Sequence, residues 1–450
     1  MRDIIHFSGI GGVGMSALAQ IAAMEGRGVS GSDRDFDRGR SLEIKAALEK
    51  LGVKIFPQDG SGVNAATSEL ALSTAIEDSN PEVVRAKELG LPVSHRSELL
   101  AAHVDGADTI VVAGTSGKST TSAMLFAALE EGGLGPSIIT GGALTALKER
   151  GLIGNAFRGK GGVLVVEGDE SDGTIKRYHP GTGLLLNITK DHKDLEELEK
   201  IFLEFAGNCS RTLVNADDPA AARLLPASPR FGRDAGGWQL EELRLEPFLS
   251  RFKINGVEFE LPVPGLYNVE NALAACAAAA LYGVKPAVTA RALKGFRGVE
   301  RRFALVGEKH GVKVVDDFAH NPAKVSAVLK ALRGAGGGRV LAVYQPHGFS
   351  PTRHLKNELI ESFSTGLADG DILIMPEIYY AGGTASKDIS SNDIVVAVAA
   401  AGREARFFGN RAGIPGVIAA LARPGDIIGV LGARDATLSA FARQILEALP

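Results

Sequence analysis

The segment from Gly114 to Thr120 has the composition of a phosphate-binding loop. It follows an apolar run at 109–113 that is typical of a β-strand. A glycine-rich turn between a strand and a helix directs backbone N–H groups at one point, which suits a polyphosphate. Lys118 is placed to reach the β- and γ-phosphates, and Ser119 or Thr120 offers a hydroxyl to Mg²⁺. The predicted ATP contacts in this loop are Gly114, Thr115, Ser116, Gly117, Lys118, Ser119 and Thr120.

Two polar clusters follow the next apolar runs of the same block. Glu167 opens the acidic stretch after the run at 163–166, and His192 lies just beyond the run at 184–187. Ligands of α/β enzymes bind at the carboxyl ends of parallel strands. A carboxylate suits Mg²⁺, and an imidazole can ligate a second metal ion or orient a phosphate. A solvated acidic turn and a structural histidine are the alternatives, but their shared position after the phosphate loop favours a metal site.

A second glycine-rich turn opens the chain. The segment from Gly9 to Gly14 fits the pattern G-x-G-x-x-G, and Asp33 lies 19 residues beyond Gly14, near the spacing of a ribose-binding acid. This pattern by itself indicates an NAD-dependent oxidoreductase. In a chain that already carries an ATP loop, the turn can instead bind the diphosphate of a nucleotide-linked substrate.

The last part of the chain carries two further candidate sites. Asp317 and His320 follow an apolar run at 312–316, where a carboxylate and an imidazole can converge on a nucleotide or an incoming amine. A proline-terminated turn that caps the next helix is the alternative. His347 ends another predicted strand, and Arg353 follows shortly after, so these groups can bind a carboxylate.

The elements that position these residues form an α/β pattern. Short apolar runs alternate with Ala- and Leu-rich stretches, as expected for parallel strands joined by crossover helices. A length of 450 residues suggests about three domains. We expect these domains to span residues 1–104, 105–297 and 298–450.

Bulk composition narrows the class of partner. A net charge of -4 without a dense Lys/Arg block disfavours nucleic acid. No apolar run approaches the roughly 20 residues that span a bilayer, and the first residues enter a predicted strand without the apolar region of a signal peptide. The two cysteines are too few for a disulfide framework. We therefore expect a cytoplasmic enzyme without membrane insertion or nucleic-acid binding.

Taken in order, these motifs resemble the Mur ligase family over nearly the whole chain. The phosphate loop is similar to the family's GT-x-GK-[ST]-T, with Glu167 and His192 on its metal-binding positions. The resemblance implies a Rossmann-like UDP-binding domain, a central P-loop ATPase-like domain and a C-terminal Rossmann-like domain. It also implies ATP and Mg²⁺ as cofactors. Further implied ATP contacts are Asn268, Asn271, the linker residue Arg302 and Asp317, and the implied catalytic residues are Lys118, His192, His320 and Arg302.

Within the family, the opening GIGGVGMS resembles the branch that joins L-alanine to UDP-N-acetylmuramate. This resemblance implies a monomer or homodimer acting on those two small molecules and ATP. A branch that adds a recycled murein tripeptide shares the opening turn and stays an alternative. Lys200 lies near a position that some branches carbamylate, and we interpret it as an ordinary surface lysine. The implied UDP contacts are Gly11, Gly12, Gly14, Ser16 and Asp33, and the implied acceptor-side residues are His347, Arg353 and Tyr379.

Overall fold

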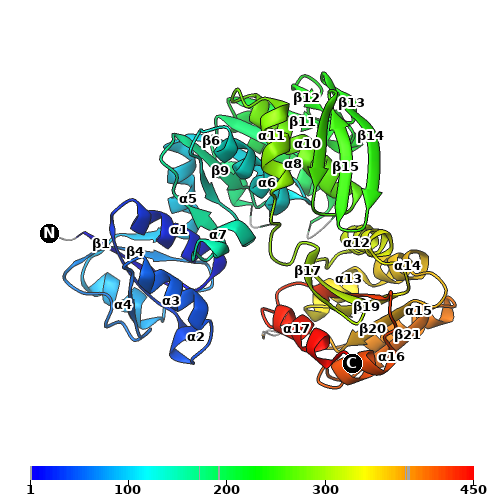
Figure 1. Cartoon of the computed structure of the whole chain (residues 1–450). Helices are drawn as coiled ribbons and strands as arrows, with labels where there is room; N and C mark the ends of the chain where they lie inside the picture. Colours follow the sequence, from blue (N-terminus) through cyan, green and yellow to red (C-terminus); the bar gives the residue numbers. More distant parts are fainter. Residues whose placement is uncertain (1–2, 172, 191–192, 381, 383–385) are drawn as a thin grey trace. The chain divides into compact units, whose positions relative to one another are not determined.

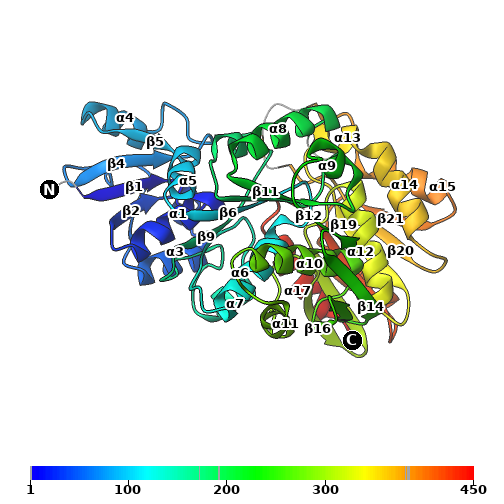
Figure 2. The same cartoon turned by 90° about the horizontal axis from the view of Figure 1, so that it is seen from above.

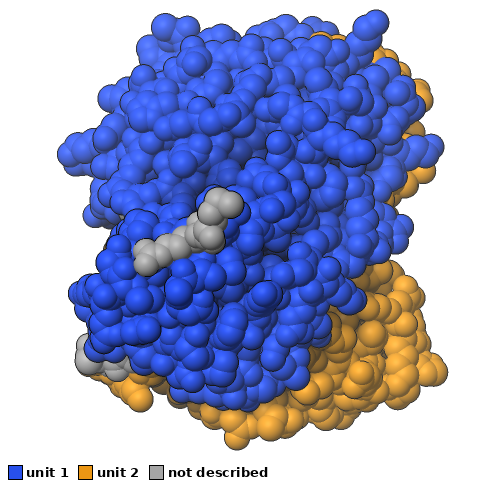
Figure 3. All heavy atoms as spheres, turned by 90° about the vertical axis from the view of Figure 1, so that its left-hand side faces the viewer, with its two compact units in different colours: residues 1–239, 271–297 blue, residues 240–270, 298–450 orange. Residues whose placement is uncertain are grey.

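The computed structural model describes two compact units of the chain. One unit contains Met1–Gln239 with Asn271–Arg297, and the other contains Leu240–Glu270 with Gly298–Pro450; Figure 3 colours them separately. The described residues are 3–171, 173–190, 193–380, 382 and 386–450.

The first sheet of unit 1 is parallel throughout, with the order β3-β2-β1-β4-β5 (Figure 1). The chain leaves the central β1 in one direction and returns to β4 on its other side, which creates a switch point where α/β folds bind ligands. The strands are β1 Ile4–Ser8, β2 Gly28–Ser32, β3 Lys54–Phe56, β4 Thr67–Leu72 and β5 Val93–His95. The helices are α1 Val13–Met24, α2 Arg34–Asp37, α3 Leu42–Lys50, α4 Pro81–Glu88 and α5 Arg96–Asp105.

The second sheet of unit 1 has the order β12-β11-β10-β6-β9-β7-β8. Its strands are parallel except for the antiparallel pair of β7 and β8. The strands are β6 Asp108–Ala113, β7 Ser137–Ile139, β8 Ala156–Phe157, β9 Val163–Glu167, β10 Thr182–Leu185, β11 Arg211–Asn215 and β12 Arg230–Phe231. The helices are α6 Lys118–Glu131, α7 Thr145–Glu149, η1 Thr174–Arg177, α8 Leu195–Asn208, α9 Pro219–Leu224, α10 Leu266–Ala280, which continues into unit 1 from Asn271, and α11 Pro286–Lys294.

Helix α6, which begins at Lys118, is held in the interior of unit 1. Most of its residues between Ser119 and Leu129 are buried, and α11 packs beside it, as Figures 1 and 2 show. Buried side chains resist displacement because protein interiors are close-packed. The first turn of α6 is therefore a rigid support for the loop that precedes it.

A four-stranded antiparallel sheet of order β13-β14-β15-β16 follows in the chain. The alternation of strands and helices in the sequence did not predict it. Its longest strand, Trp238–Glu246, is largely exposed and rich in charged residues. It therefore lacks the short apolar run that predicts a buried strand. The strands are β13 Asp234–Ala235, β14 Trp238–Glu246, β15 Leu249–Ile254 and β16 Val257–Leu261.

The large sheet of unit 2 has the order β17-β18-β22-β19-β20-β21, parallel except for β17. Alternate residues of β19 enter two separate cores, one under α12, α14 and α15 and one under α16 and α17, so helices cover both faces (Figure 2). The strands are β17 Ala304–Lys309, β18 Val312–Asp317, β19 Val340–Gln345, β20 Ile372–Pro376, β21 Glu404–Phe408 and β22 Ile427–Gly432. The helices are α12 Pro322–Ala335, α13 Phe349–His354, α14 Lys356–Gly366, α15 Ser391–Ala400, α16 Ile414–Leu421 and α17 Leu438–Ala448.

This architecture confirms the predicted α/β class. Its three larger sheets are consistent with the predicted Rossmann-like and P-loop-like domains. One predicted strand is shifted: the run at 184–187 was expected to be a strand throughout, whereas β10 ends at Leu185. Asn187 therefore lies in the loop beyond the sheet, where its side chain is available for the site. Among the described residues, no helix combines the length and the apolar composition needed to cross a bilayer.

Candidate functional site

The phosphate-binding loop joins β6 to α6 through a turn that only glycine can make. Gly117 has φ of +84° and caps α6. A Cβ at this position would lie 2.4 Å from Asn271 Oδ1, an atom that also accepts a hydrogen bond from the Thr121 hydroxyl at 3.1 Å. Asn271 is thus brought against the loop, and the tight approach leaves no room for a side chain at residue 117.

Asn187 holds the loop from the neighbouring strand. Its Oδ1 accepts hydrogen bonds from the Ser116 backbone N–H and the Thr115 hydroxyl, both at 2.9 Å, and its Nδ2 donates to the Ser116 carbonyl at 3.0 Å. Thr189 adds a contact of 2.7 Å between its hydroxyl and that of Thr115. Asn187 and Thr189 were not predicted from the sequence as site residues. Their only signal was their position after a strand next to β6.

Lys118 forms a largely buried ion pair at the loop. Its Nζ donates to Glu170 Oε2 at 2.7 Å and to the Gly114 carbonyl at 2.6 Å. The side chains of Lys118 and Glu170 are only 13% and 5% exposed. Burial raises the pKa of Glu170, and the Lys118 ammonium opposes that rise. Glu170 was part of the predicted acidic cluster, but its pairing with the loop lysine was not predicted.

Glu167 lies at the end of β9 with each carboxylate oxygen oriented. The Ser119 hydroxyl donates to Oε1 at 2.8 Å, while the Thr140 hydroxyl and the Gly141 N–H donate to Oε2 at 2.6 and 2.7 Å. The structure thereby brings together two of the predicted metal ligands, Ser119 and Glu167. The third, His192, lies outside the described residues.

This donor set fits Mg²⁺, which uses one or two carboxylates together with phosphate oxygens and water. The described residues contain no cluster of three or more His, Cys, Asp or Glu side chains of the kind that encloses a metal ion completely. A hydroxyl and a carboxylate beside a phosphate loop are hard oxygen donors. These two donors suit a cation whose remaining ligands come from a bound nucleotide and water.

The opening glycine turn contacts the acid that follows β2. Asp33 Oδ2 accepts the Gly11 N–H at 2.8 Å, and Asp33 Oδ1 accepts the Asp35 N–H at 2.8 Å and caps α2. Gly12 is exposed at the start of α1. Arg96, the first residue of α5, lies close to the turn, because a Cβ at Gly14 would be 2.9 Å from its Nη1. Sequence patterns did not reveal this cation, since it comes from a distant helix.

Asn155 connects the start of α1 with the segment that holds Glu167. Its Nδ2 donates to the Val13 carbonyl at 2.7 Å and to the Ser16 hydroxyl at 3.0 Å. Its own carbonyl accepts the N–H of Thr140 at 2.9 Å, the residue whose hydroxyl holds Glu167. Ser16, a predicted UDP contact, is buried and its hydroxyl also donates to Val13 O at 3.1 Å. Ser16 therefore positions α1 from inside.

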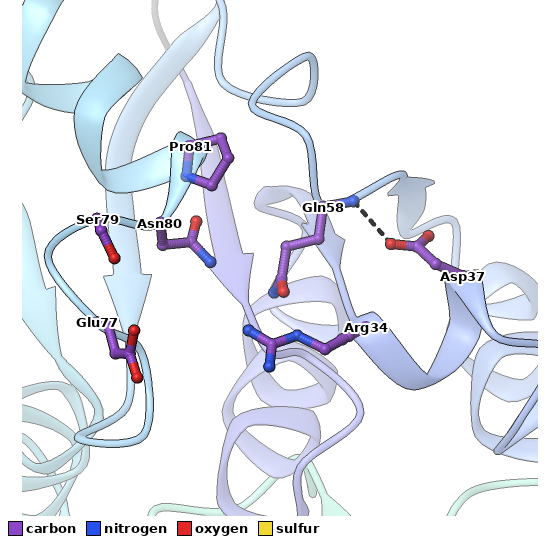
Figure 4. Close-up of a pocket in the computed structure, with 7 residues that line it drawn as sticks. All are labelled: Arg34, Asp37, Gln58, Glu77, Ser79, Asn80 and Pro81. Carbon is purple, nitrogen blue, oxygen red and sulfur yellow. Dashed lines mark hydrogen bonds between the residues drawn. The ribbon is translucent and has the colours of Figure 1, made fainter.

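A polar pocket lies in unit 1, between segments that follow strands of the first sheet (Figure 4). Arg34 and Gln58 face Glu77 and Asn80 across it, and the Gln58 N–H donates to Asp37 at 3.1 Å. The lining segments follow β2, β3 and β4, so the pocket lies at the carboxyl edge of the sheet. The lining residues are Arg34, Asp37, Gln58, Glu77, Ser79, Asn80 and Pro81.

A buried hydrogen-bonded cluster supports that edge. Glu82, in the first turn of α4, accepts the Ser8 hydroxyl at 2.5 Å and contacts His6 Nε2 at 2.9 Å. His6 Nδ1 lies 2.9 Å from the Ser30 hydroxyl, and His6 and Glu82 are both fully buried. The cluster ties β1, β2 and α4 together just behind the opening turn.

Two of the predicted ATP contacts, Asp317 and Arg302, lie at the end of β18 in unit 2. The carboxylate of Asp317 accepts the N–H groups of Phe303 and Ala319, both at 2.7 Å. Burial raises the pKa of Asp317 to about 6, against the effect of the Arg302 charge. The Arg302 guanidinium lies 5.0 Å from the centre of the Phe318 ring. Asp317 therefore fixes the backbone on which the neighbouring predicted residues lie.

Of the three predicted acceptor-side residues, the structure brings His347 and Tyr379 together in unit 2. The rings of His320 and His347 lie 5.5 Å apart, and the backbone of His347 pairs with that of Tyr379. Arg353 is paired with Asp388 and donates to the Ser386 carbonyl at 3.1 Å. A substrate carboxylate at Arg353 would have to compete with Asp388.

Two further positions have structural partners. Asn321 caps α12 through the Lys324 N–H at 2.9 Å, so the capping alternative holds for this residue. Asn268 Nδ2 donates to the Pro264 carbonyl at 2.7 Å within unit 2. Lys200 is exposed on α8.

The three parts of the chain match three family models in order. They are the "Mur ligase family, catalytic domain" at residues 4–107, the "Mur ligase middle domain" at 112–279 and the "Mur ligase, glutamate ligase domain" at 301–434. The boundaries predicted from the sequence at 104 and 297 stay predictions.

Similar proteins match over almost the whole length. UDP-N-acetylmuramate–L-alanine ligase of Streptomyces avermitilis is 37% identical, over 97% of this chain and 95% of that protein. The protein of the same name from Sinorhizobium medicae is 33% identical, over 99% and 97%. The crystal structure of UDP-N-acetylmuramate-alanine ligase from Thermotoga maritima is 27% identical with a TM-score of 0.81, over 99% and 98%. A murein peptide ligase from Psychrobacter arcticus, 23% identical with a TM-score of 0.70 over 99% and 98%, shares the fold. This chain belongs to the Mur ligase family.

Proposed function

We propose that this protein is an ATP-dependent ligase that joins L-alanine to UDP-N-acetylmuramate in the cytoplasm, during peptidoglycan synthesis. The observation that carries the proposal is the convergence of Lys118, Ser119 and Glu167 at one edge of the central sheet. That arrangement supports transfer of a phosphoryl group. The names of the full-length relatives support the choice of the two other substrates.

In the first step, a carboxylate oxygen of UDP-N-acetylmuramate attacks the γ-phosphorus of ATP. A new P–O bond forms, the bond to the β-phosphate oxygen breaks, and ADP leaves with the electron pair. Lys118 and the backbone N–H groups at the start of α6 offset the negative charge on the phosphoryl oxygens. Asn187 keeps the loop in the geometry that presents those groups.

In the second step, the amine of L-alanine attacks the acyl carbon, and phosphate leaves as the amide forms. The role assigned to His320 in this proposal is to orient the amine or to accept its proton. His347, Tyr379 and Arg353 are the proposed contacts for the amino-acid carboxylate, with Asp388 as the partner that Arg353 gives up.

Ser119 and Glu167, with His192, would hold Mg²⁺. When bound, this ion neutralises phosphate charge. Thr140 and Gly141 orient Glu167 for that contact. Asn268 and Asn271 are the proposed adenine-side residues, and Arg302 and Asp317 are further proposed ATP contacts. Asn271 contacts the loop within unit 1.

The opening turn is the proposed site of the UDP diphosphate. Gly11, Gly12 and Gly14 leave the backbone accessible, Asp33 and Ser16 hold the turn in place, and Arg96 supplies a cation beside it. The polar pocket that begins at Arg34 lies at the same sheet edge and suits the hydrogen-bonding edges of a nucleoside.

Phosphate release tests the proposal directly. The purified protein is incubated with UDP-N-acetylmuramate, ATP and Mg²⁺, together with L-alanine, glycine, L-serine or the murein tripeptide. We expect the fastest release with L-alanine and a product heavier than UDP-N-acetylmuramate by one alanine residue. Phosphate release with the murein tripeptide but with none of the three amino acids would support the recycling alternative. Hydride transfer to NAD without ligation would support the NAD-dependent oxidoreductase.

A further inference from the structure

The ion pair of Lys118 and Glu170 occupies the position at which the loop lysine would meet a nucleotide. An ammonium group has three donors, and Lys118 directs two hydrogen bonds to Glu170 Oε2 and the Gly114 carbonyl. A carboxylate oxygen 2.7 Å from Nζ has the geometry that a phosphate oxygen takes on a lysine. Glu170 therefore stands where a phosphate is expected.

A polyphosphate and the Glu170 carboxylate are both anions, so they repel each other when both lie at one ammonium group. The repulsion is strong here because the Glu170 side chain is only 5% exposed and water screens it poorly. A buried charge also needs a partner, since an unpaired buried charge is costly. Each of the two anions can thus satisfy Lys118, but each weakens the binding of the other.

We propose that Glu170 is a place-holding counter-ion, which keeps Lys118 in the loop of the free protein and is displaced from it by the nucleotide phosphate. This inference depends on one part of the proposed function, namely that the Gly114–Thr120 loop binds ATP. Its consequence is that Glu170 lowers nucleotide affinity, whereas a residue that only orients Lys118 toward phosphate would increase that affinity.

The test measures ADP binding by calorimetry in the absence of divalent metal, for the full chain and for Glu170→Gln. The substitution removes the charge and keeps the shape, so we expect ADP to bind about 10-fold more tightly. Glu130→Gln is the matched control: Glu130 lies at the far end of α6, and its carboxylate accepts hydrogen bonds from Arg150 at 2.8 and 2.9 Å, so the same charge is removed away from Lys118. This control is expected to change the affinity by less than about twofold.

The inference is overturned if Glu170→Gln does not bind ADP more tightly than both the unchanged protein and Glu130→Gln. Glu170→Asp provides a second test if the glutamine variant folds poorly, because shortening the side chain withdraws the carboxylate from Lys118 and predicts a smaller gain in affinity. Failure of the proposed function would look different. In that case the unchanged protein would not bind ADP, or Lys118→Ala would bind it equally well.

Discussion

The two glycine-rich turns of unit 1 begin in the same way and become different sites. Each follows a central parallel strand, β1 or β6, and each leads into a buried helix. The turn at Gly9–Gly14 contains no charged residue of its own and takes its polar partners, Asp33 and Arg96, from other elements. The loop at Gly114–Thr120 carries its own cation, which is already neutralised by Glu170.

This difference indicates how two glycine turns of the same type come to suit different ligands. Glycine turns supply N–H groups and space, which suit any phosphate. The side chains from neighbouring strand ends then determine the charge of the site and its capacity for a metal ion. At the second loop Asn187 holds the backbone, Glu167 adds a carboxylate suited to a cation that accompanies ATP, and Glu170 pairs with the loop lysine.

The largest effect is expected from removing the cation that distinguishes the second loop. Lys118→Ala should lower kcat/KM for ligation by roughly 100- to 1,000-fold, because charge on the phosphoryl oxygens is no longer offset. Calorimetry should still detect binding of UDP-N-acetylmuramate at the other turn, which also verifies that the variant is folded. A fully active Lys118→Ala protein would remove the distinction between the two turns.

A smaller effect is expected when the loop loses its contacts with Asn187 but keeps Lys118. Asn187→Ala removes the contacts with both the N–H and the carbonyl of Ser116. Since each net hydrogen bond contributes about 1 kcal/mol, kcat/KM for ATP should fall about 10- to 100-fold. Thr189→Val, which removes one hydroxyl contact to Thr115, is the control and should lose less. An equal loss in both variants would contradict the role of Asn187.

The smallest effect is expected at the opening turn. Gly12 is exposed, and a Cβ there would meet only Gly9 O at 3.4 Å, so Gly12→Val should fold normally. Its side chain should raise the KM for UDP-N-acetylmuramate about 10-fold by blocking close approach of the diphosphate, with the KM for ATP unchanged. A rise confined to ATP would reverse the assignment of the two turns.

Gly11→Ala provides the contrasting variant at the same turn. Its Cβ would lie 2.9 Å from Asp33 Oδ2 and 3.1 Å from the Phe36 ring, so it should lower the Tm as well as weaken substrate binding. An unchanged Tm would show that the turn can shift away from Asp33.

The sequence carried enough information to recognise the loop at Lys118 and to pair Ser119 with Glu167, because both lie directly after apolar runs that form strands. Three residues that contact the two turns or Glu167 could not be predicted from the sequence, for a common reason. Thr140, Asn155 and Arg96 are ordinary polar residues without a local motif, and they reach the site only through the packing of strands and helices. The exposed hairpin sheet could not be predicted because its strands are not apolar.

By itself, the sequence determined the α/β class, the two phosphate-type turns and the family resemblance, since these depend on residue type and short-range spacing. Only the tertiary structure decided which side chains complete each turn. The order β12-β11-β10-β6-β9-β7-β8 places the strand ends that carry Asn187 and Glu167 on either side of β6. The distances from Lys118 to Glu170 and from Thr140 to Glu167 follow from that order, because hydrogen bonding between strands sets which ends are neighbours.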